Sequence, residues 1–154
     1  MVKYYNAMVV FEEIPDEITL AINITNCPCH CDGCHSKFLW EDIGTPLTSD
    51  ELDLLIEKND GITCVCFMGG DAKPDIICTL AEYVHEVKHL KVGWYSGMDS
   101  FYKDINFKWF DYIKIGHYDA KMGGLDKKTT NQHLYKITSE KKTDITSKLW
   151  KNTK

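Results

Sequence analysis

Four cysteines lie within eight residues of the sequence, and this cluster constrains the chain more than any other feature. The segment 24–36 reads ITNCPCHCDGCHS and contains Cys27, Cys29, Cys31 and Cys34. Thiols this close together indicate a disulfide knot, a zinc site or an iron–sulfur cluster. The chain has seven cysteines, an odd number that cannot pair completely within one molecule. The disulfide knot is therefore the weakest of the three explanations.

Composition narrows the class of protein. The chain has 154 residues, which predicts a single domain over 1–154, with 139–154 as a weak terminal helix or a frayed tail. The net charge is −5 and all 18 basic residues are lysines, so neither a basic surface nor the arginine fork favours a nucleic-acid partner. No apolar run is long enough for a membrane span, and residues 1–15 lack the plan of a signal peptide. We therefore expect a cytoplasmic protein whose thiols are reduced.

Hydrophobic patterning predicts alternating strands and helices. In some segments apolar residues alternate with polar ones or form a continuous run, as in strands. In others they recur at helical spacing, and one of these segments begins with a capping box formed by Thr48 and Glu51. Strands are expected at 5–11, 18–25, 62–70, 91–97 and 110–116, and helices at 48–59, 74–90 and, more briefly, 100–105. This order is typical of parallel strands joined by helical crossovers. The predicted fold class is α/β, an incomplete β/α barrel with mostly parallel strands, because the chain is too short for a full barrel.

The chemistry of such a fold is expected at the carboxyl ends of its strands. The cysteine segment follows one predicted strand directly. Gly69 and Gly70 end a second strand, and Ser96 and Gly97 end a third. These groups should therefore gather at one edge of the sheet.

The thiol spacing itself favours a cluster over zinc. Cys27, Cys31 and Cys34 form C-x3-C-x2-C, and three thiolates on a cubane of four irons leave one iron without a protein ligand. A structural zinc site needs a fourth ligand, for which Cys29, His30 or His35 are the candidates. No second ligand pair with zinc spacing follows later in the sequence. Both metals remain open from spacing alone.

The motifs together resemble the radical S-adenosylmethionine superfamily. The cysteine segment follows the predicted strand at 18–25, and the stretch MGGD (68–71) lies at the end of the next predicted strand, at 62–70. Within that superfamily the chain is similar to the anaerobic ribonucleotide reductase activating proteins, through NCPCHCDGCHS, WYSG (94–97) and TTNQHLYKI (129–137). The resemblance spans about residues 18–137.

The resemblance implies a set of site residues. Cys27, Cys31 and Cys34 would bind a [4Fe–4S] cluster, and S-adenosylmethionine would chelate the remaining iron. The residues implied to bind S-adenosylmethionine are Gly33, Cys34 and His35 near the adenosine part, Gly69, Gly70 and Asp71 near the methionine part, and Ser96. No side chain is expected to act as acid or base, because the cluster and S-adenosylmethionine carry the chemistry.

The resemblance also implies a reaction and its partners. Reductive cleavage of S-adenosylmethionine would give a 5′-deoxyadenosyl radical, which would take a hydrogen atom from a glycine of the large subunit of the reductase. An electron donor such as flavodoxin would supply the electron. Two alternatives stay open: activation of a different glycyl radical enzyme, and a non-catalytic binding module stabilised by zinc.

Several residues depart from the family pattern or have simpler explanations. Asp71 stands where the superfamily more often has glutamate, and His133 stands where this branch has arginine. Cys29 is an additional thiol, for which a bystander role is expected. The other cysteines, Cys64, Cys66 and Cys78, are interpreted as buried thiols, and His85 and His89 as a solvated helix face.

Overall fold

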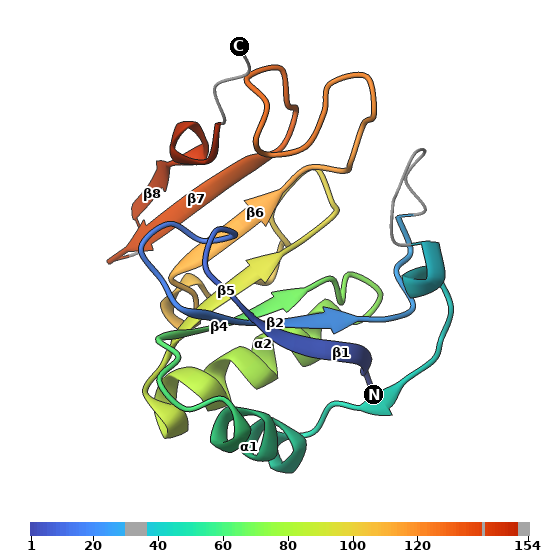
Figure 1. Ribbon diagram of the computed structural model, residues 1–154, viewed down its shortest axis with the longest axis vertical. Helices are drawn as coiled ribbons and strands as arrows, with labels where there is room; N and C mark the ends of the chain where they lie inside the picture. Colours follow the sequence, from blue (N-terminus) through green and yellow to red (C-terminus); the bar gives the residue numbers. More distant parts are fainter. Residues whose placement is uncertain (30–36, 140, 151–154) are drawn as a thin grey trace.

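The computed structural model describes residues 1–29, 37–139 and 141–150. Figure 1 shows one sheet with two α-helices packed against it. The strands are β1 (Lys3–Val10), β2 (Thr19–Ile24), β3 (Thr45–Pro46), β4 (Cys64–Met68), β5 (Lys91–Tyr95), β6 (Tyr112–Ile115), β7 (His133–Thr138) and β8 (Lys141–Asp144). The helices are α1 (Ser49–Lys58) and α2 (Pro74–Tyr83), a π turn η2 (Val84–Lys88) that continues α2, and the 3₁₀ turns η1 (Lys37–Trp40), η3 (Phe107–Trp109) and η4 (Thr146–Leu149).

The sheet is mixed, and the prediction of an incomplete barrel with mostly parallel strands is wrong. The strand order is β3-β1-β2-β4-β5-β6-β7-β8. Only β2, β4, β5 and β6 are mutually parallel. The outer pairs, β3 with β1, β1 with β2, β6 with β7 and β7 with β8, are antiparallel. A parallel block is thus flanked on both sides by antiparallel strands.

The reason lies in the connections between the strands. Parallel neighbours require a crossover, which α1 provides between β2 and β4 and α2 provides between β4 and β5. Between β5 and β6 the crossover contains only η3, and residues 100–105 do not form the short helix that the sequence predicts. Each flanking strand instead pairs antiparallel with its neighbour. An α-helical barrel wall therefore does not form.

Local sequence explains why α1 begins where it does. Thr48 is extended and its hydroxyl accepts a hydrogen bond from the Glu51 backbone nitrogen at 3.2 Å. This is the Thr48 half of the predicted capping box, while the Glu51 carboxylate accepts a hydrogen bond from the Tyr4 hydroxyl at 2.6 Å. Leu52 and Leu55 then lie on one side of the helix and are buried. The predicted helix start and its apolar face are confirmed.

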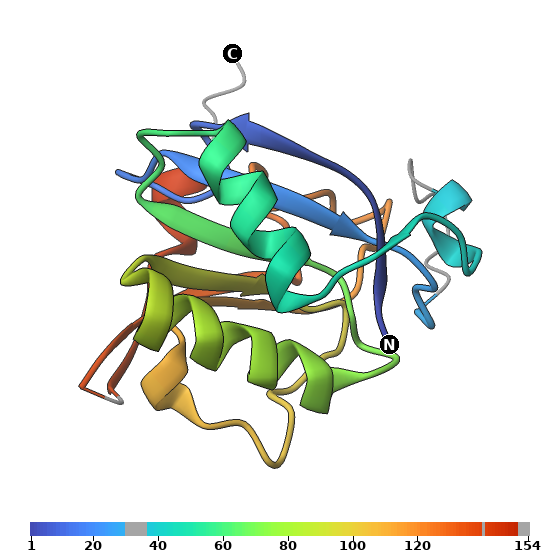
Figure 2. The same ribbon diagram turned by 90° about the horizontal axis from the view of Figure 1, so that it is seen from below.

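The sheet separates two hydrophobic clusters. α1 and α2 lie on the same face of the sheet, which we call the helical face (Figure 2). The larger cluster fills this face with side chains such as Phe67, Trp94 and Ile113. On the opposite face a smaller cluster includes Cys64 and Cys66, together with Ile14, Tyr95, Tyr112, Leu134 and Ile145. Alternation along β4 explains the division, because Val65 and Phe67 point one way and Cys64 and Cys66 the other.

One buried carboxylate joins the amino ends of the parallel strands. Glu17 is only 5% exposed. It accepts hydrogen bonds from the Lys91 Nζ at 2.8 Å, the Thr63 hydroxyl at 2.7 Å and the Tyr112 hydroxyl at 2.7 Å. Burial alone would raise the pKa of Glu17, but these three hydrogen bonds and the lysine charge outweigh it and lower the pKa below its usual value. The carboxylate ties the start of β2 to β4, β5 and β6.

The C-terminal part of the described chain belongs to the sheet. Within the segment 139–154, residues 141–149 form β8 and η4, and Ile145 is buried in the opposite-face cluster. Among the described helices, none has the length and apolar character that crossing a bilayer requires.

Candidate functional site

The carboxyl ends of the parallel strands meet at one edge, which we call the carboxyl edge. The arrowheads of β2, β4, β5 and β6 point to the same side in Figure 1. Backbone hydrogen bonds hold these ends together: the Gly69 nitrogen donates to the Tyr95 oxygen at 3.0 Å, and the Ser96 nitrogen donates to the Lys114 oxygen at 2.9 Å. The strand ends therefore meet at one edge, as predicted, although the fold is not an incomplete barrel.

The cysteine segment leaves this edge through a fixed turn. Asn26 follows β2 in the left-handed region at φ 60°, a conformation that asparagine tolerates well. Its backbone nitrogen donates to the Glu41 oxygen, and the Cys27 nitrogen donates to the Leu39 oxygen, both at 2.9 Å. The two ends of the segment between Cys27 and Leu39 are therefore held side by side. Cys27 lies at the base of a closed loop.

The structure describes only part of the predicted ligand set. Cys27 is described and half-buried, next to the end of β2. The other two predicted cluster ligands, Cys31 and Cys34, and the predicted S-adenosylmethionine contacts Gly33 and His35 lie outside the described residues. These four assignments remain predictions.

Cys29, the additional thiol, packs against the end of β5. A Cβ atom built on Gly97 would lie 2.7 Å from the Cys29 Sγ and 3.4 Å from the Cys29 Cβ. Real Cβ atoms do not approach other atoms as closely as the first of these distances, so only glycine permits this contact. The pair links the cysteine segment to the strand end that follows Tyr95. The sequence did not suggest this role for Cys29.

Gly69 and Gly70 form a turn that no other residue type fits. Both lie in the left-handed region, at φ 111° and φ 93°. A Cβ on Gly69 would lie 3.3 Å from the Ile24 oxygen, and one on Gly70 would lie 2.5 Å from the Ile77 side chain. The turn brings the backbone of β4 close to the end of β2 and lets α2 pack directly against it. Both glycines lie at the carboxyl edge, as the sequence predicts.

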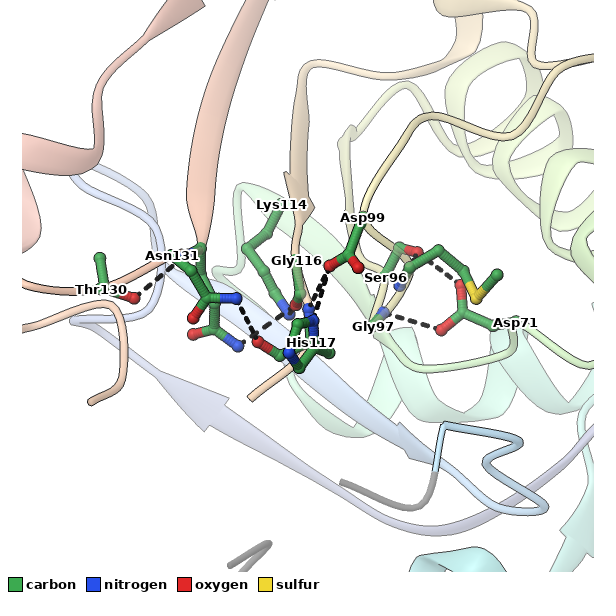
Figure 3. A network of polar contacts seen from close by, with 11 residues as sticks. Asp71, Ser96, Gly97, Asp99, Lys114, Gly116, His117, Thr130 and Asn131 are labelled. Carbon is green, nitrogen blue, oxygen red and sulfur yellow. Dashed lines mark hydrogen bonds and ion pairs between the residues drawn. The ribbon is translucent and has the colours of Figure 1, made fainter. Parts of the chain in front are cut away.

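Asp71 connects the ends of β4 and β5. One carboxylate oxygen accepts a hydrogen bond from the Ser96 hydroxyl at 2.5 Å, and the other accepts one from the Gly97 backbone nitrogen at 2.8 Å (Figure 3). Ser96 is only 5% exposed, and its hydroxyl in turn accepts from the Met98 nitrogen at 3.1 Å. The structure therefore brings Asp71 and Ser96, two residues predicted for the same ligand, into direct contact.

A second polar group that the sequence did not single out lies farther along the edge. The Asp99 carboxylate accepts hydrogen bonds from the His117 backbone nitrogen at 3.1 Å and contacts the His117 Nδ1 at 2.8 Å (Figure 3). These bonds lower the pKa of Asp99 below its usual value. The Asn131 amide donates to the His117 oxygen at 3.1 Å. Asp99 and Asn131 lie 18 and 14 residues from His117, so no local sequence pattern predicts this group.

Lys114 is a buried cation at the end of β6. It is 7% exposed, and its Nζ donates to the Gly116 oxygen at 3.0 Å. The same oxygen accepts a hydrogen bond from the buried Gln132 amide at 3.3 Å. The segment 129–137, which resembles a family motif, therefore contributes Asn131 and Gln132 to the carboxyl edge.

His133, which stands where the resembled branch has arginine, pairs with a carboxylate of the neighbouring strand. Its Nδ1 lies 2.9 Å from the Asp144 carboxylate of β8, so the ring links two antiparallel strands. The hydrogen bonds from Thr146 and from His133 lower the pKa of Asp144 against the opposing effect of burial.

A cavity of about 300 Å³ opens beside Asp71. It lies between the start of α2 and the crossover that follows β5. Its walls combine aromatic and polar side chains, among them Trp94, Ser96, Phe101 and Tyr102. The Trp94 Nε1 donates to the Gly69 oxygen at 2.8 Å, so its ring is fixed in this wall.

The remaining thiols and imidazoles that the structure describes do not form a metal site. Cys64 and Cys66 are fully buried, as predicted, and burial raises the pKa of both thiols. Burial also raises the pKa of Cys78, to about 11. The His85 ring packs edge-on against Trp109, with centroids 5.6 Å apart, rather than lying on a purely solvated face. Within residues 1–29, 37–139 and 141–150, no three metal-binding side chains converge.

The structure describes one of the three thiols that the sequence implies for a cluster, Cys27, and the carboxylate that it implies for the ligand, Asp71. Thiolates are the ligands that iron–sulfur clusters use. The cysteine segment starts at the carboxyl edge, and the Cys29 side chain occupies the space that a Cβ on Gly97 would need. Asp71 offers carboxylate oxygens next to the paired glycines, and their remaining acceptor positions could take hydrogen bonds from an ammonium group. Cys27 and Asp71 are thus donor types that the two groups use.

Comparison with known proteins adds no relative. The chain matches no family model, no curated protein and no solved structure.

Proposed function

We propose that the protein is a radical S-adenosylmethionine activase that generates a glycyl radical on the anaerobic ribonucleotide reductase. One observation carries the proposal: Cys27, Cys31 and Cys34 have C-x3-C-x2-C spacing directly after β2. A tight loop lets thiolates converge on one cluster, and three of them leave one iron free for a ligand. The cluster, when bound, would supply the electron for reductive cleavage of S-adenosylmethionine.

Asp71 and the paired glycines would hold the methionine part of the ligand. Gly69 and Gly70 form a turn without side chains at the end of β4. The Asp71 carboxylate would accept charge-assisted hydrogen bonds from the ligand's ammonium group. Ser96 already donates to that carboxylate and would orient it. Gly33, Cys34 and His35 are the residues proposed for the adenosine part.

The buried surroundings of the edge would protect the reaction from water. Ser96 and Lys114 are both less than a tenth exposed, and their backbones are hydrogen-bonded to each other at 2.9 Å. Excluding water around a reactive species prevents side reactions. We propose that the large glycyl radical subunit closes the remaining open side, that an electron donor such as flavodoxin reduces the cluster, and that the protein works in the cytoplasm.

Metal analysis of protein purified without oxygen tests the proposal first. We expect a brown protein with about four irons per chain, which converts S-adenosylmethionine to methionine and 5′-deoxyadenosine after reduction with dithionite. Cys31→Ala should abolish both the iron and the conversion. Cys78→Ala is the matched control, because this thiol lies on α2 away from the carboxyl edge, and it should retain both.

Two results would contradict the assignment. A colourless protein with one zinc per chain would favour the zinc-stabilised binding module. If Cys31→Ala still converts S-adenosylmethionine, the proposed set of cluster ligands is wrong.

The target is tested separately by electron paramagnetic resonance of the large reductase subunit after incubation with the reduced protein. If cleavage occurs but no glycyl radical forms on that subunit, the target is a different glycyl radical enzyme.

A further inference from the structure

Another cavity, of about 230 Å³, lies at the end of the sheet where β7 and β8 pair. Its walls come from the segment before β7, the start of β7, the end of β8 and the turn η4. Figure 1 shows these elements at one margin of the sheet, close to the C-terminus. Seven of the eight residues that line the cavity are polar or charged, and the eighth is Trp150. Its chemistry therefore differs from that of the aromatic cavity beside Asp71.

The cavity lies in the most basic part of the described chain. Residues 121–139 and 141–150 contain seven lysines and only two acidic residues, Asp126 and Asp144, although the whole chain has a net charge of −5. A cleft surrounded by charge of one sign raises the local concentration of ligands with the opposite sign. The surroundings of this cavity therefore favour an anion.

The one carboxylate in the cavity wall is engaged by protein donors. One Asp144 oxygen accepts hydrogen bonds from the Thr146 backbone nitrogen at 2.9 Å and from the Thr146 hydroxyl at 2.5 Å. The other oxygen lies 2.9 Å from the His133 Nδ1. Because this contact uses Nδ1, Nε2 is the nitrogen with which His133 would contact a ligand, and in the protonated ring it donates a hydrogen bond.

Lys128, Thr130 and Ser147 add donors of the kinds that bind phosphate. The Thr130 hydroxyl accepts a hydrogen bond from the Gln132 backbone nitrogen at 3.1 Å, so its proton can be donated to a ligand. Ammonium, hydroxyl and imidazolium groups all donate to phosphate oxygens, and those bonds that involve charged groups are the stronger ones. Four side chains in one cavity wall thus offer donors to an anion.

Trp150 gives the same cavity a flat apolar surface. Its side chain is 39% exposed, and the Lys128 Nζ lies 6.0 Å from the centre of its ring. Nucleobases stack on aromatic rings with little dependence on which base is bound. A ring next to a lysine therefore suits a ligand that carries a planar base and phosphate in one molecule.

The cavity is near the carboxyl edge but separate from the proposed active site. Gln132 lines it, and the Gln132 amide donates to the Gly116 oxygen at 3.3 Å at that edge. None of the residues proposed to bind the cluster or S-adenosylmethionine lines the cavity. A ligand bound here would therefore leave the proposed active site accessible.

We infer that this cavity binds a nucleotide. The phosphate groups lie against Lys128, His133 and the hydroxyls of Thr130 and Ser147, and the base stacks on Trp150. Inorganic phosphate uses the donors alone, whereas a nucleotide also uses the ring. The basic surroundings attract the ligand, and the cavity wall selects it.

Isothermal titration calorimetry of the full chain with ATP tests this inference. ATP should bind with one site per chain. Tripolyphosphate, which has no base, and adenosine, which has no phosphate, should each bind at least tenfold more weakly. Saturating S-adenosylmethionine should leave the affinity for ATP unchanged, because the two sites share no residue.

Three variants assign the binding to the cavity. Lys128→Gln should weaken ATP binding about tenfold, because it removes a charged donor. Trp150→Leu should weaken ATP binding to a similar extent and leave tripolyphosphate binding unchanged. Lys136→Gln is the matched control, since it removes the same charge from an exposed position on β7 outside the cavity, and it should bind ATP like the unaltered protein. Circular dichroism spectra and melting temperatures establish that each variant is folded.

Four outcomes would overturn the inference. The first is an absence of ATP binding, and the second is an equal loss in Lys128→Gln and Lys136→Gln, which indicates attraction by general charge only. The third is tripolyphosphate binding as tight as that of ATP. The fourth is competition by S-adenosylmethionine, which would place ATP at the other site. The titrations need no iron, so the nucleotide site and the proposed activity succeed or fail separately.

Discussion

At the scale of single residues, Asp71 has two roles to reconcile. The sequence predicts a ligand contact, and the structure also gives its oxygens two protein donors, Ser96 and the Gly97 backbone. The two roles are compatible, since a carboxylate has about four acceptor positions. Asp71 therefore serves as a structural bridge between strand ends in addition to its proposed part in binding.

The contact between Gly97 and Cys29 yields a prediction about the cysteine segment. Gly97→Ala should displace the thiol, because its Cβ would lie 2.7 Å from the sulfur. The sulfur can rotate away, so we expect a loss of about 1 kcal/mol in unfolding free energy and reduced iron retention after anaerobic reconstitution. Urea unfolding and iron analysis measure the two effects.

A second substitution separates this contact from a general effect of alanine. Cys29→Ala combined with Gly97→Ala should recover most of the loss, because the remaining Cβ-to-Cβ distance of 3.4 Å is an ordinary contact. Gly124→Ala, whose nearest neighbour would lie 3.5 Å away, is the control and should change little. If the double variant is no better than Gly97→Ala alone, the thiol is not the cause.

Single-residue predictions from sequence succeed where the signal is local. Cys64 and Cys66 were expected to be buried because they sit inside an apolar run, and both are fully buried. The role of Glu17 could not be predicted in the same way. Its partners Thr63, Lys91 and Tyr112 are 46, 74 and 95 residues away, so no spacing rule connects them.

At the scale of elements, the Glu17 network is expected to make the junction of four strands sensitive to pH. The folded-state pKa of Glu17 is lowered, so its contribution to stability is present above the unfolded pKa of about 4.3 and is lost as pH falls through the lower folded value. Glu17→Gln should therefore cost about 2 kcal/mol at pH 7. The difference from the unaltered protein should shrink below pH 4.

Urea unfolding of both proteins between pH 3 and pH 7 measures this difference. Glu57→Gln is a suitable control, because it changes a carboxylate on α1 outside the network. A gap between Glu17→Gln and the unaltered protein that stays constant over the whole pH range would contradict the assignment of the effect to the charged carboxylate.

Elements with a cap or a continuous apolar run were predictable, and β7, which has neither, was not. The helix after Thr48 was predicted from its capping box. β7 was missed because its apolar residues do not alternate: Leu134 packs on the opposite face and Ile137, three positions later, on the helical face. Its sequence HLYKIT is also rich in polar residues. Pairing with β6 and β8, and not its own pattern, makes it a strand.

At the scale of the whole molecule, the parallel block was predictable and its flanks were not. Strand and helix patterns in the chain predicted β2, β4 and β5 with their helical crossovers. Nothing local shows that β1 pairs antiparallel with β2, or that β7 follows β6 antiparallel. Direction and neighbour depend on contacts between distant segments. The carboxyl edge was predicted correctly because it depends only on the parallel block.

The position of the core predicts that the fold survives loss of metal. The described core residues pass from Ile24 directly to Leu47, so Cys27 and Cys29 belong to neither hydrophobic cluster. Protein treated with a chelator should therefore keep its far-ultraviolet circular dichroism and cooperative urea unfolding, while losing its brown colour. A zinc-stabilised module would instead unfold under the same treatment.

The bond from Gly97 to Asp71 makes one backbone amide a reporter of what happens at the carboxyl edge. This amide is protected from hydrogen exchange only while the carboxylate accepts its proton. A ligand whose ammonium occupies the remaining acceptor positions would hold the carboxylate against this amide and slow deuterium uptake at Gly97. Occupancy could then be followed at a single position in protein that carries out no turnover at all.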